Sequence, residues 1–292
     1  MNRLISSLQA DFIPKSNRPV FSIITTHHGL ADTTDPLFCC VASVVDQENI
    51  TLEQIVQHTG GLSGLWNRLA RDLNLSKKGA HYGLRILEEK NSSFFDLLQR
   101  GLQRAQGRLL GFLKPEEQYL PGALAAVEKE FQIHPQMDVL ITGCFVVDPK
   151  TNQITPHHTA SFSPEYLTTC SPKFFPSTIF FRTTLISEGF TFDATYDEAT
   201  FAEWLLRILN AGKKVGTLDF FTSVITQPTK EEYSSNFSSG YEKLLQRAPA
   251  IMRFLRPWWK LRHQMATKKN KSSAPVHCLR YQLGSLNERK PF

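Results

Sequence analysis

The chain has 292 residues, of which 41% are hydrophobic and 21% charged, and its net charge is +6. This composition supports one large core or two smaller ones, without the run of about 18 apolar residues that a membrane-spanning helix needs. A polar N-terminal segment without secretory character, and five scattered cysteines without a C-x-x-C pair, indicate a cytoplasmic protein with neither a zinc site nor a disulfide framework.

Positive charge is concentrated near the C-terminus. Of the 33 Lys and Arg residues, ten lie in residues 243–286, a stretch without Asp or Glu. The other 23 are outnumbered by the 27 acidic residues, all of which lie outside this stretch. The body of the protein therefore has no basic surplus of the kind that indicates nucleic acid as a partner.

The N-terminal part of the chain alternates between short apolar runs and amphipathic segments, after an irregular lead-in expected over residues 1–18. Apolar runs predict strands at residues 20–26, 54–57, 84–87 and 109–113. Apolar residues at helical spacing predict helices at residues 36–46, 65–73 and 94–105. A charged turn, Lys114-Pro115-Glu116-Glu117, follows the fourth strand, and a new helix is expected from Pro121.

The alternation continues in the second half. Strands are predicted at residues 138–148, 178–182 and 214–218, with a turn at 149–152 and a helix at 200–210 that Gly212 ends. Strands and helices that alternate over about 200 residues predict an α/β fold with a mostly parallel central sheet flanked by helices.

A change of composition near Pro228 predicts two parts, residues 1–227 and a basic, partly helical segment of residues 228–292. Residues 234–240 read as a linker, and residues 241–266 as one or two basic helices broken at Pro249 and Pro257. Residues 268–273 are rich in Lys and Ser and are expected to be disordered.

Several short motifs occur in a recognisable order. They are FSIIT (21–25), CVASVVDQ (40–47), LEQIV (52–56), the stretch 99–124 with YLPGAL at its end, FFR (180–182), GF (189–190), FD (192–193), EWLLRI (203–208) and AG (211–212). In this order the chain resembles a family 2 glycosyltransferase. The resemblance covers residues 20 to 220 and implies a GT-A type nucleotide-diphospho-sugar transferase fold. It also implies sugar transfer with inversion.

The chain departs from this family where the family carries acidic residues. The positions at which an Asp is usual hold His58, Ser63 and Asn91. The acidic metal-binding motif is replaced by Lys114-Pro115-Glu116-Glu117. The resemblance implies nucleotide-sugar contacts at the strand ends from Thr25, His27, His58, Asn91, Asp96 and Lys114.

Transfer from a nucleotide sugar requires that the charge of the leaving diphosphate be neutralised. Glu116 and Glu117 are candidate ligands for Mg²⁺ or Mn²⁺. Lys114 offers a metal-independent route, because its ammonium group can meet the diphosphate directly. A third interpretation is a solvated turn whose glutamates cap the following helix.

The acceptor hydroxyl requires a general base. Glu203 matches a family Asp, and Asp197 and Glu198 lie just upstream, so Glu203 and Asp197 are the candidate catalytic residues; the alternative is that all three are surface charges. Asp96 is either a ligand contact or a solvated helix residue. Adjacent histidines on a strand point to opposite faces, so His27-His28 and His157-His158 do not predict a metal site.

The leading hypothesis is a glycosyltransferase that moves a sugar from a nucleotide-diphosphate sugar to a glycan or lipid-linked acceptor in polysaccharide synthesis. The alternative is a catalytically inactive relative that acts as a binding or scaffold protein. Residues 243–271 interleave aromatic and basic residues, which suits an anionic membrane surface. We therefore expect a cytoplasmic protein that can lie at the inner face of the membrane.

Overall fold

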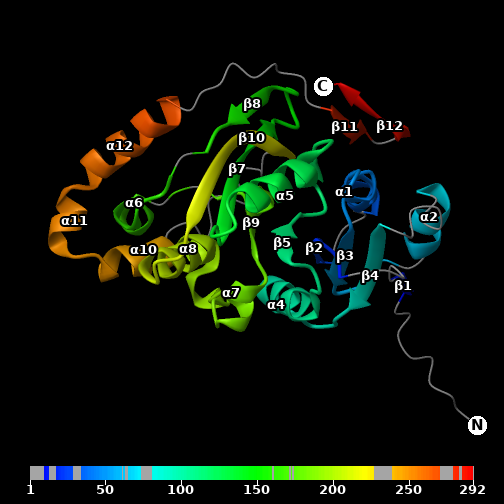
Figure 1. Ribbon diagram of the computed structural model, residues 1–292, viewed down its shortest axis with the longest axis horizontal. Helices are drawn as coiled ribbons and strands as arrows, with labels where there is room; N and C mark the ends of the chain where they lie inside the picture. The colour runs from blue at the N-terminus through cyan, green and yellow to red at the C-terminus, as the bar shows by residue number, and fades with distance from the viewer. Residues whose placement is uncertain are drawn as a thin grey trace, which may run out of the picture.

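The computed structural model describes residues 10–12, 18–28, 34–60, 62, 65–73, 81–159, 161–170, 172, 174–226, 239–269, 279–282 and 285–291. Ten strands of this part of the chain form one sheet (Figure 1). In spatial order the first nine are β1 (Ala10–Phe12), β4 (Tyr82–Glu88), β3 (Leu52–His58), β2 (Phe21–His27), β5 (Leu109–Phe112), β9 (Ile179–Arg182), β7 (Val139–Val147), β10 (Val215–Thr226) and β6 (Gln118–Tyr119). The tenth, β8 (Ile154–His157), pairs with β7 outside this path.

Strand direction decides where the chain places its functional groups. β2 is parallel to β3 and β5, β3 is parallel to β4, and β7 is parallel to β10. β9 is antiparallel to both β5 and β7, so β7 and β10 run in the same direction as β5. The carboxyl ends of six strands therefore meet at one edge of the sheet, where open α/β sheets place their ligands.

Helices cover both faces of the sheet (Figure 1). One face packs against α1 (Thr34–Val45), α2 (Leu65–Asp72) and α5 (Ala123–Ile133). The other packs against α4 (Phe94–Arg104), α6 (Pro164–Thr169) and α8 (Thr200–Asn210). β2 shows why both faces are apolar: Ile23 packs in the first core and Ile24 in the second. Strands buried on both faces read as the continuous apolar runs seen in the sequence.

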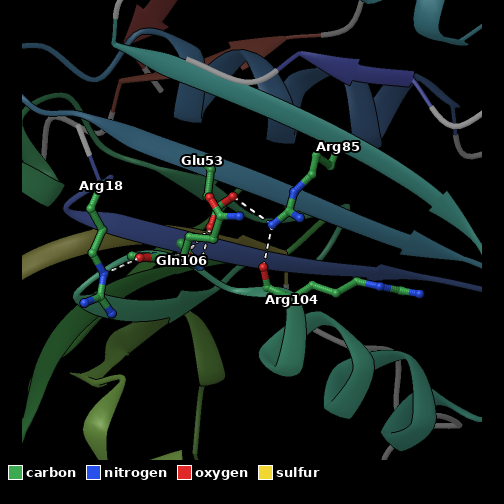
Figure 2. A network of polar contacts seen from close by, with 7 residues as sticks. Arg18, Glu53, Arg85, Arg104 and Gln106 are labelled. Atoms are coloured by element: carbon green, nitrogen blue, oxygen red, sulfur yellow. Dashed lines mark hydrogen bonds and ion pairs between the residues drawn. The ribbon is translucent and has the colours of Figure 1, made fainter. Parts of the chain in front are cut away.

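A hydrogen-bonded network closes the amino end of the sheet, opposite the ligand edge (Figure 2). Glu53 is buried at the start of β3, where its Oε1 accepts the Ser22 hydroxyl and the Gln106 N–H, both at 2.6 Å. Its Oε2 accepts Arg85 Nη2 at 2.8 Å, and the same nitrogen donates to the Arg104 carbonyl at 2.6 Å. The network ties β2, β3 and β4 to the turn between α4 and β5.

Gly107, in that same turn, is required by space. A Cβ at this position would lie 2.4 Å from the backbone nitrogen of Ser22. Its own N–H donates to the Ser22 hydroxyl at 2.7 Å. The turn therefore approaches β2 closely, and this fixes where β5 begins.

The strands and helices predicted from apolar patterns are present, with three corrections. Residues 10–12 of the expected lead-in form β1, antiparallel to β4. β10 continues to Thr226 through register shifts between Leu218 and Ser223, where exposed Asp219 and Phe220 interrupt its apolar pattern. Lys268 and Lys269, expected to be disordered, belong to a helix, whereas residues 270–273 lie outside the described residues.

Three helices follow the sheet along one side of the molecule (Figure 1). They are α10 (Ser239–Arg247), α11 (Ala250–Phe254) and α12 (Arg256–Lys269). Pro249 precedes α11 and Pro257 is the second residue of α12, so the helices change at the predicted prolines. No helix in the described ranges is long and apolar enough to cross a membrane.

A C-terminal hairpin, β11 (Leu279–Gln282) and β12 (Ser285–Pro291), lies against α1 and was not predicted. The Gln118 side chain bonds both the N–H and the carbonyl of Tyr281, at 2.8 and 3.1 Å. The Tyr281 hydroxyl donates to Asp46 at 2.8 Å. The hairpin thus contacts the residue that directly follows Glu117. A separate part beginning at residue 228 stays a prediction.

Candidate functional site

Three strands end side by side with polar residues. The β-sheet register places His27 opposite His58, and His58 opposite Glu88. His27 is 3% and His58 7% exposed, whereas the Glu88 side chain is 38% exposed. The parallel sheet therefore brings the three side chains to one register position, although His27 and Glu88 lie 61 positions apart in sequence. These are the ends at which a nucleotide would be held.

Both histidines are neutral near pH 7. Burial lowers the pKa of His27, and the neighbouring His58 lowers it further. Burial also lowers the pKa of His58, and the charge of Glu88 opposes this effect. The Gly60 N–H donates to His58 Nδ1 at 3.1 Å, so this nitrogen carries no proton and Nε2 does. His58 can therefore donate a hydrogen bond from Nε2 to an acceptor on a nucleobase or ribose.

Thr25 lies beneath these ends. It is fully buried, and its hydroxyl accepts the Gln54 side-chain N–H at 3.0 Å. Gln54 is held in turn by the Tyr82 hydroxyl at 3.0 Å. Thr25 therefore supports the strand ends from inside the core in this structure. Ser63, named beside His58 at sequence level, lies outside the described residues.

The charged turn after β5 is a β-turn with Pro115 at its second position. The Glu117 N–H donates to the Lys114 carbonyl at 3.0 Å, and the Glu117 carboxylate accepts the Lys114 N–H at 3.1 Å. Proline at this position favours such a turn because its φ is already set. The Glu117 side chain thus closes the turn from inside, while Lys114 is part-exposed and Glu116 is exposed.

Glu117 is only 2% exposed. Burial raises its pKa to about 7, with Glu116 raising it and Lys114 and Ser177 lowering it. The contact with Ser177 comes from the 3₁₀ helix η1 (Pro176–Thr178), which joins the turn to the second half of the fold. No sequence pattern predicts this contact, because Ser177 lies 60 residues from Glu117 in a segment without periodic apolar residues.

The residues of this turn do not fit a resident divalent cation. Metal binding needs convergent, ionised oxygens. Glu117 is turned inward and holds the turn, so Glu116 is the one exposed carboxylate of the motif, beside the cationic Lys114. Within the described ranges, no group of three or more His, Cys, Asp or Glu side chains is placed to hold a metal ion. The donor set favours an anion near Lys114 over a cation.

Asn91 and Asp96 lie at the start of α4. Asn91 is exposed, with a φ of 56°, a left-handed conformation that Asn tolerates well. Asp96 forms a capping box: its carboxylate accepts the Ser93 N–H at 3.0 Å and the Ser93 hydroxyl at 2.7 Å. The Ser93 hydroxyl lowers the pKa of Asp96. The structure therefore gives Asp96 a helix-capping contact.

Glu203 is buried in the first turn of α8 and is already paired. Both of its carboxylate oxygens accept Arg207 Nε at 2.9 Å. Arg207 also donates to the Thr191 carbonyl at 2.5 Å. The carboxylate is therefore oriented toward Arg207 of the same helix. The pairing with Arg207 follows the common four-residue helical spacing, which the sequence contains.

Asp197 differs from Glu203 in both exposure and backbone. It lies in the 3₁₀ helix η2 (Ala194–Ala199), is exposed, and has φ 44° and ψ −118°. A non-glycine residue in such a region carries strain of order 1–3 kcal/mol, and such residues cluster at functional sites. Its carboxylate accepts the Ser239 hydroxyl at 3.2 Å, from the first residue of α10.

An aromatic cluster joins the charged turn to the start of α8. Phe112 ends β5, two residues before Lys114, and Phe201 is the second residue of α8; their rings lie 5.7 Å apart. Phe192 packs against both rings, at 5.7 and 5.0 Å. The turn and the loop with Asp197 therefore lie at the same end of the sheet. Sequence reasoning missed this cluster, whose members look like ordinary core residues.

Comparison with solved structures identifies the fold. S. aureus TarS residues 1–349 matches with a TM-score of 0.55 at 15% identity, over 86% of this chain and 73% of that chain. The same TarS fragment in complex with UDP-GlcNAc matches equally well at 16% identity. Mannosyltransferase PcManGT from Pyrobaculum calidifontis, in complex with GDP-Man and Mn²⁺, matches with a TM-score of 0.51 at 12% identity, over 90% of this chain and 78% of that chain.

These neighbours have the GT-A type fold, so the chain is an α/β protein of GT-A type, as the sequence predicted. No protein-family model matches the sequence. No curated protein matches it either. The comparisons therefore show the fold of the chain and not its membership of family 2.

Proposed function

We propose that this protein is a glycosyltransferase related to family 2. It transfers a sugar from a nucleotide-diphosphate sugar to a glycan or lipid-linked acceptor in polysaccharide synthesis, on the cytoplasmic side of the membrane. The observation that carries the proposal is the convergence of His27, His58 and the turn of Lys114 at the carboxyl edge of a GT-A type sheet. Neighbours of this fold were solved with UDP-GlcNAc and with GDP-Man, which supports the same class of donor.

The donor lies across the ends of β2, β3 and β5. Neutral His27 and His58 hydrogen-bond the nucleoside, and Asn91 and Glu88 border the same edge. Lys114 neutralises the diphosphate. Because Glu117 holds the Lys114 backbone, the turn sets where the Lys114 side chain leaves the main chain. We propose action without a metal; a Mg²⁺ or Mn²⁺ requirement through Glu116 is the competing proposal.

Transfer is a single displacement. The acceptor hydroxyl oxygen attacks the anomeric carbon of the donor sugar. The bond between this carbon and the diphosphate oxygen breaks, and the nucleoside diphosphate leaves with the electron pair. Displacement from the opposite side inverts the anomeric configuration. The hydroxyl proton passes to Asp197, which is exposed, whereas Glu203 is held by Arg207. Glu203 instead holds Arg207, which donates to the Thr191 carbonyl ahead of α8.

A second function is favoured by one observation. Two of the candidate carboxylates, Glu117 and Glu203, are buried and engaged with other groups. A protein that binds a nucleotide or glycan without turnover would have the same arrangement.

Binding and turnover can be tested separately. Thermal unfolding is measured with UDP-, GDP- and dTDP-sugars, in EDTA or with Mn²⁺. One donor is expected to raise the Tm in EDTA, because a ligand that binds the folded state stabilises it. Loss of this shift in Lys114→Met, with unchanged Tm of the free protein, supports the diphosphate contact. A shift that appears only with Mn²⁺ supports the metal alternative, and no shift with any donor contradicts the proposal.

Turnover is measured as release of nucleoside diphosphate from the donor that binds. Asp197→Asn is expected to bind the donor normally and to lower the rate about 100-fold or more, which is a typical loss for a general base. Glu203→Gln serves as the comparison. If Glu203→Gln loses turnover and Asp197→Asn does not, the base is Glu203. Donor binding without turnover in the unmodified protein supports the non-catalytic function.

A further inference from the structure

Five large apolar side chains lie exposed on one side of α11 and α12. Ile251, Phe254, Trp258, Leu261 and Met265 are 62%, 80%, 50%, 52% and 57% exposed. They recur every three or four residues, so they form one stripe along the two helices. We call these five residues the apolar stripe. The other exposed large hydrophobic residues of the described chain, Ile133 and Phe220, do not continue this stripe.

The apolar stripe is not the face by which α12 packs on the protein. That face carries His263, whose ring stacks on Tyr166 of α6 at 3.9 Å and on Phe162 at 5.3 Å. Trp259, one helical turn before His263, is also part-buried. α12 therefore has two apolar faces, of which one is satisfied by α6 and the other faces outward.

The charges around the stripe are all of one sign. Arg253, Arg256, Lys260 and Arg262 are exposed, and none of them has an ion-pair partner among the described residues. No Asp or Glu occurs between residues 243 and 286. The Arg262 guanidinium lies 5.6 Å from the Trp258 ring centre, so apolar and cationic groups share one surface. Apolar groups that insert between cations are the pattern of helices at anionic membrane surfaces.

We infer that α11 and α12 dock on an anionic lipid bilayer, with the apolar stripe in the headgroup region. A second copy of the chain fits this surface less well, because pairing two such faces would bring two sets of unpaired cations together. The sequence suggested only that residues 243–271 suit a membrane. The structure names the face that inserts, and it separates this face from the residues that hold α12 on the protein.

The docking surface lies on the half of the fold that carries Asp197. α12 packs on α6, and α6 packs on α8. Gly240 of α10 lies against η2, where an added Cβ would stand 1.9 Å from the Tyr196 carbonyl oxygen. A membrane under α12 would therefore lie beside the half that carries the proposed base, Asp197. The inference itself does not depend on sugar transfer, since lipid binding is measured without a donor.

The test uses the full chain and flotation with two kinds of vesicle, pure phosphatidylcholine and phosphatidylcholine with 30% phosphatidylglycerol. A triple variant, Phe254→Ser, Leu261→Ser and Met265→Ser, removes much of the stripe. These side chains are exposed, so the fold should persist. A second variant, Arg253→Gln with Lys260→Gln, removes charge alone. Ile133→Ser is the matched control, because Ile133 is similarly exposed on α5.

The unmodified chain is expected to float with anionic vesicles and not with neutral ones. The triple variant should bind at least about tenfold more weakly. The charge variant should bind more weakly than the unmodified chain at low salt and should lose less binding as salt rises, because it has fewer charges to screen. Ile133→Ser should bind normally. The inference is overturned if the chain does not bind anionic vesicles, or if the triple variant binds as well as the control. A third outcome also overturns the inference. The unmodified chain would sediment as a dimer and bind no vesicles, and the triple variant would sediment as a monomer.

Discussion

Two buried glutamates lie at opposite ends of the same sheet and differ in how their carboxylates are hydrogen-bonded. Glu53, at the amino end, accepts hydrogen bonds from Ser22, Gln106 and Arg85 within 2.8 Å (Figure 2). Glu117, at the carboxyl edge, accepts the Lys114 N–H at 3.1 Å, and burial raises its pKa to about 7. A buried charge is tolerated when it is paired and hydrogen-bonded, and costs stability when it is not.

The difference separates the groups that hold the fold from those available for binding. At the amino end, Arg85 pairs with Glu53 across neighbouring strands. At the carboxyl edge, the histidines are neutral and Lys114 is part-exposed. Functional sites commonly break the rules of stability that the rest of a protein obeys.

The largest expected effect is at the amino end. Glu53→Gln keeps the shape of the side chain but sets an amide NH₂ against the Arg85 guanidinium. Removing one partner of a buried ion pair costs about 3–5 kcal/mol, so the unfolding free energy from denaturant titration should fall by this amount. Arg108→Gln, which breaks the exposed pair with Glu128, should cost no more than about 1 kcal/mol. Equal effects of the two variants would remove the distinction.

Glu117→Gln should raise the free energy of unfolding near pH 8, whereas Glu53→Gln lowers it. Burial raises the pKa of Glu117 from 4.5 to about 7, so between these values the folded state keeps a proton that the unfolded state has released. Stability should then fall as pH rises through this window. Glu117→Gln should flatten the slope and stabilise the protein by up to about 3 kcal/mol at pH 8, with little change at pH 4.5. A variant that is less stable than the unmodified chain at pH 8 contradicts the assignment.

Strain at Asp197 gives a smaller effect. Asp197→Gly relieves a backbone conformation that only glycine adopts readily. The free energy of unfolding should therefore rise by about 1 kcal/mol, measured by denaturant titration. The loss of the hydrogen bond from Ser239 acts in the other direction, and Ser239→Ala measures that part alone. If the glycine variant is destabilised beyond Ser239→Ala, Asp197 is not strained.

The smallest effect concerns the capping box of α4. Ser93→Ala removes the hydroxyl that bonds the Asp96 N–H at 3.1 Å, and should cost about 1 kcal/mol. Donor affinity should not change, because the structure gives Asp96 a contact within the helix start. Reduced donor affinity in Ser93→Ala at unchanged stability would return Asp96 to the ligand contacts predicted from sequence.

The predicted fold class is confirmed, whereas the roles predicted for the site residues stay predictions. The apolar runs at residues 20–26 and 109–113 were visible because these strands are buried on both faces. β1 and β6 were missed because they have only three and two residues, too few to show an alternating apolar pattern. The Glu53 and Arg85 pair depends on the register of two strands, so no local pattern reveals it. The inward turn of Glu117 depends on Ser177, and the strain of Asp197 on how η2 meets α8.

Nucleotide affinity in EDTA tests the central claim most directly. The donor that raises the Tm is titrated calorimetrically into three proteins: the unmodified chain, Lys114→Met and Arg108→Gln. The account predicts affinity without a metal, reduced about tenfold to a hundredfold in Lys114→Met, as expected for a lost charge-assisted contact, with stability unchanged. Arg108→Gln should bind normally. Equal affinity in Lys114→Met and the unmodified chain would contradict the account.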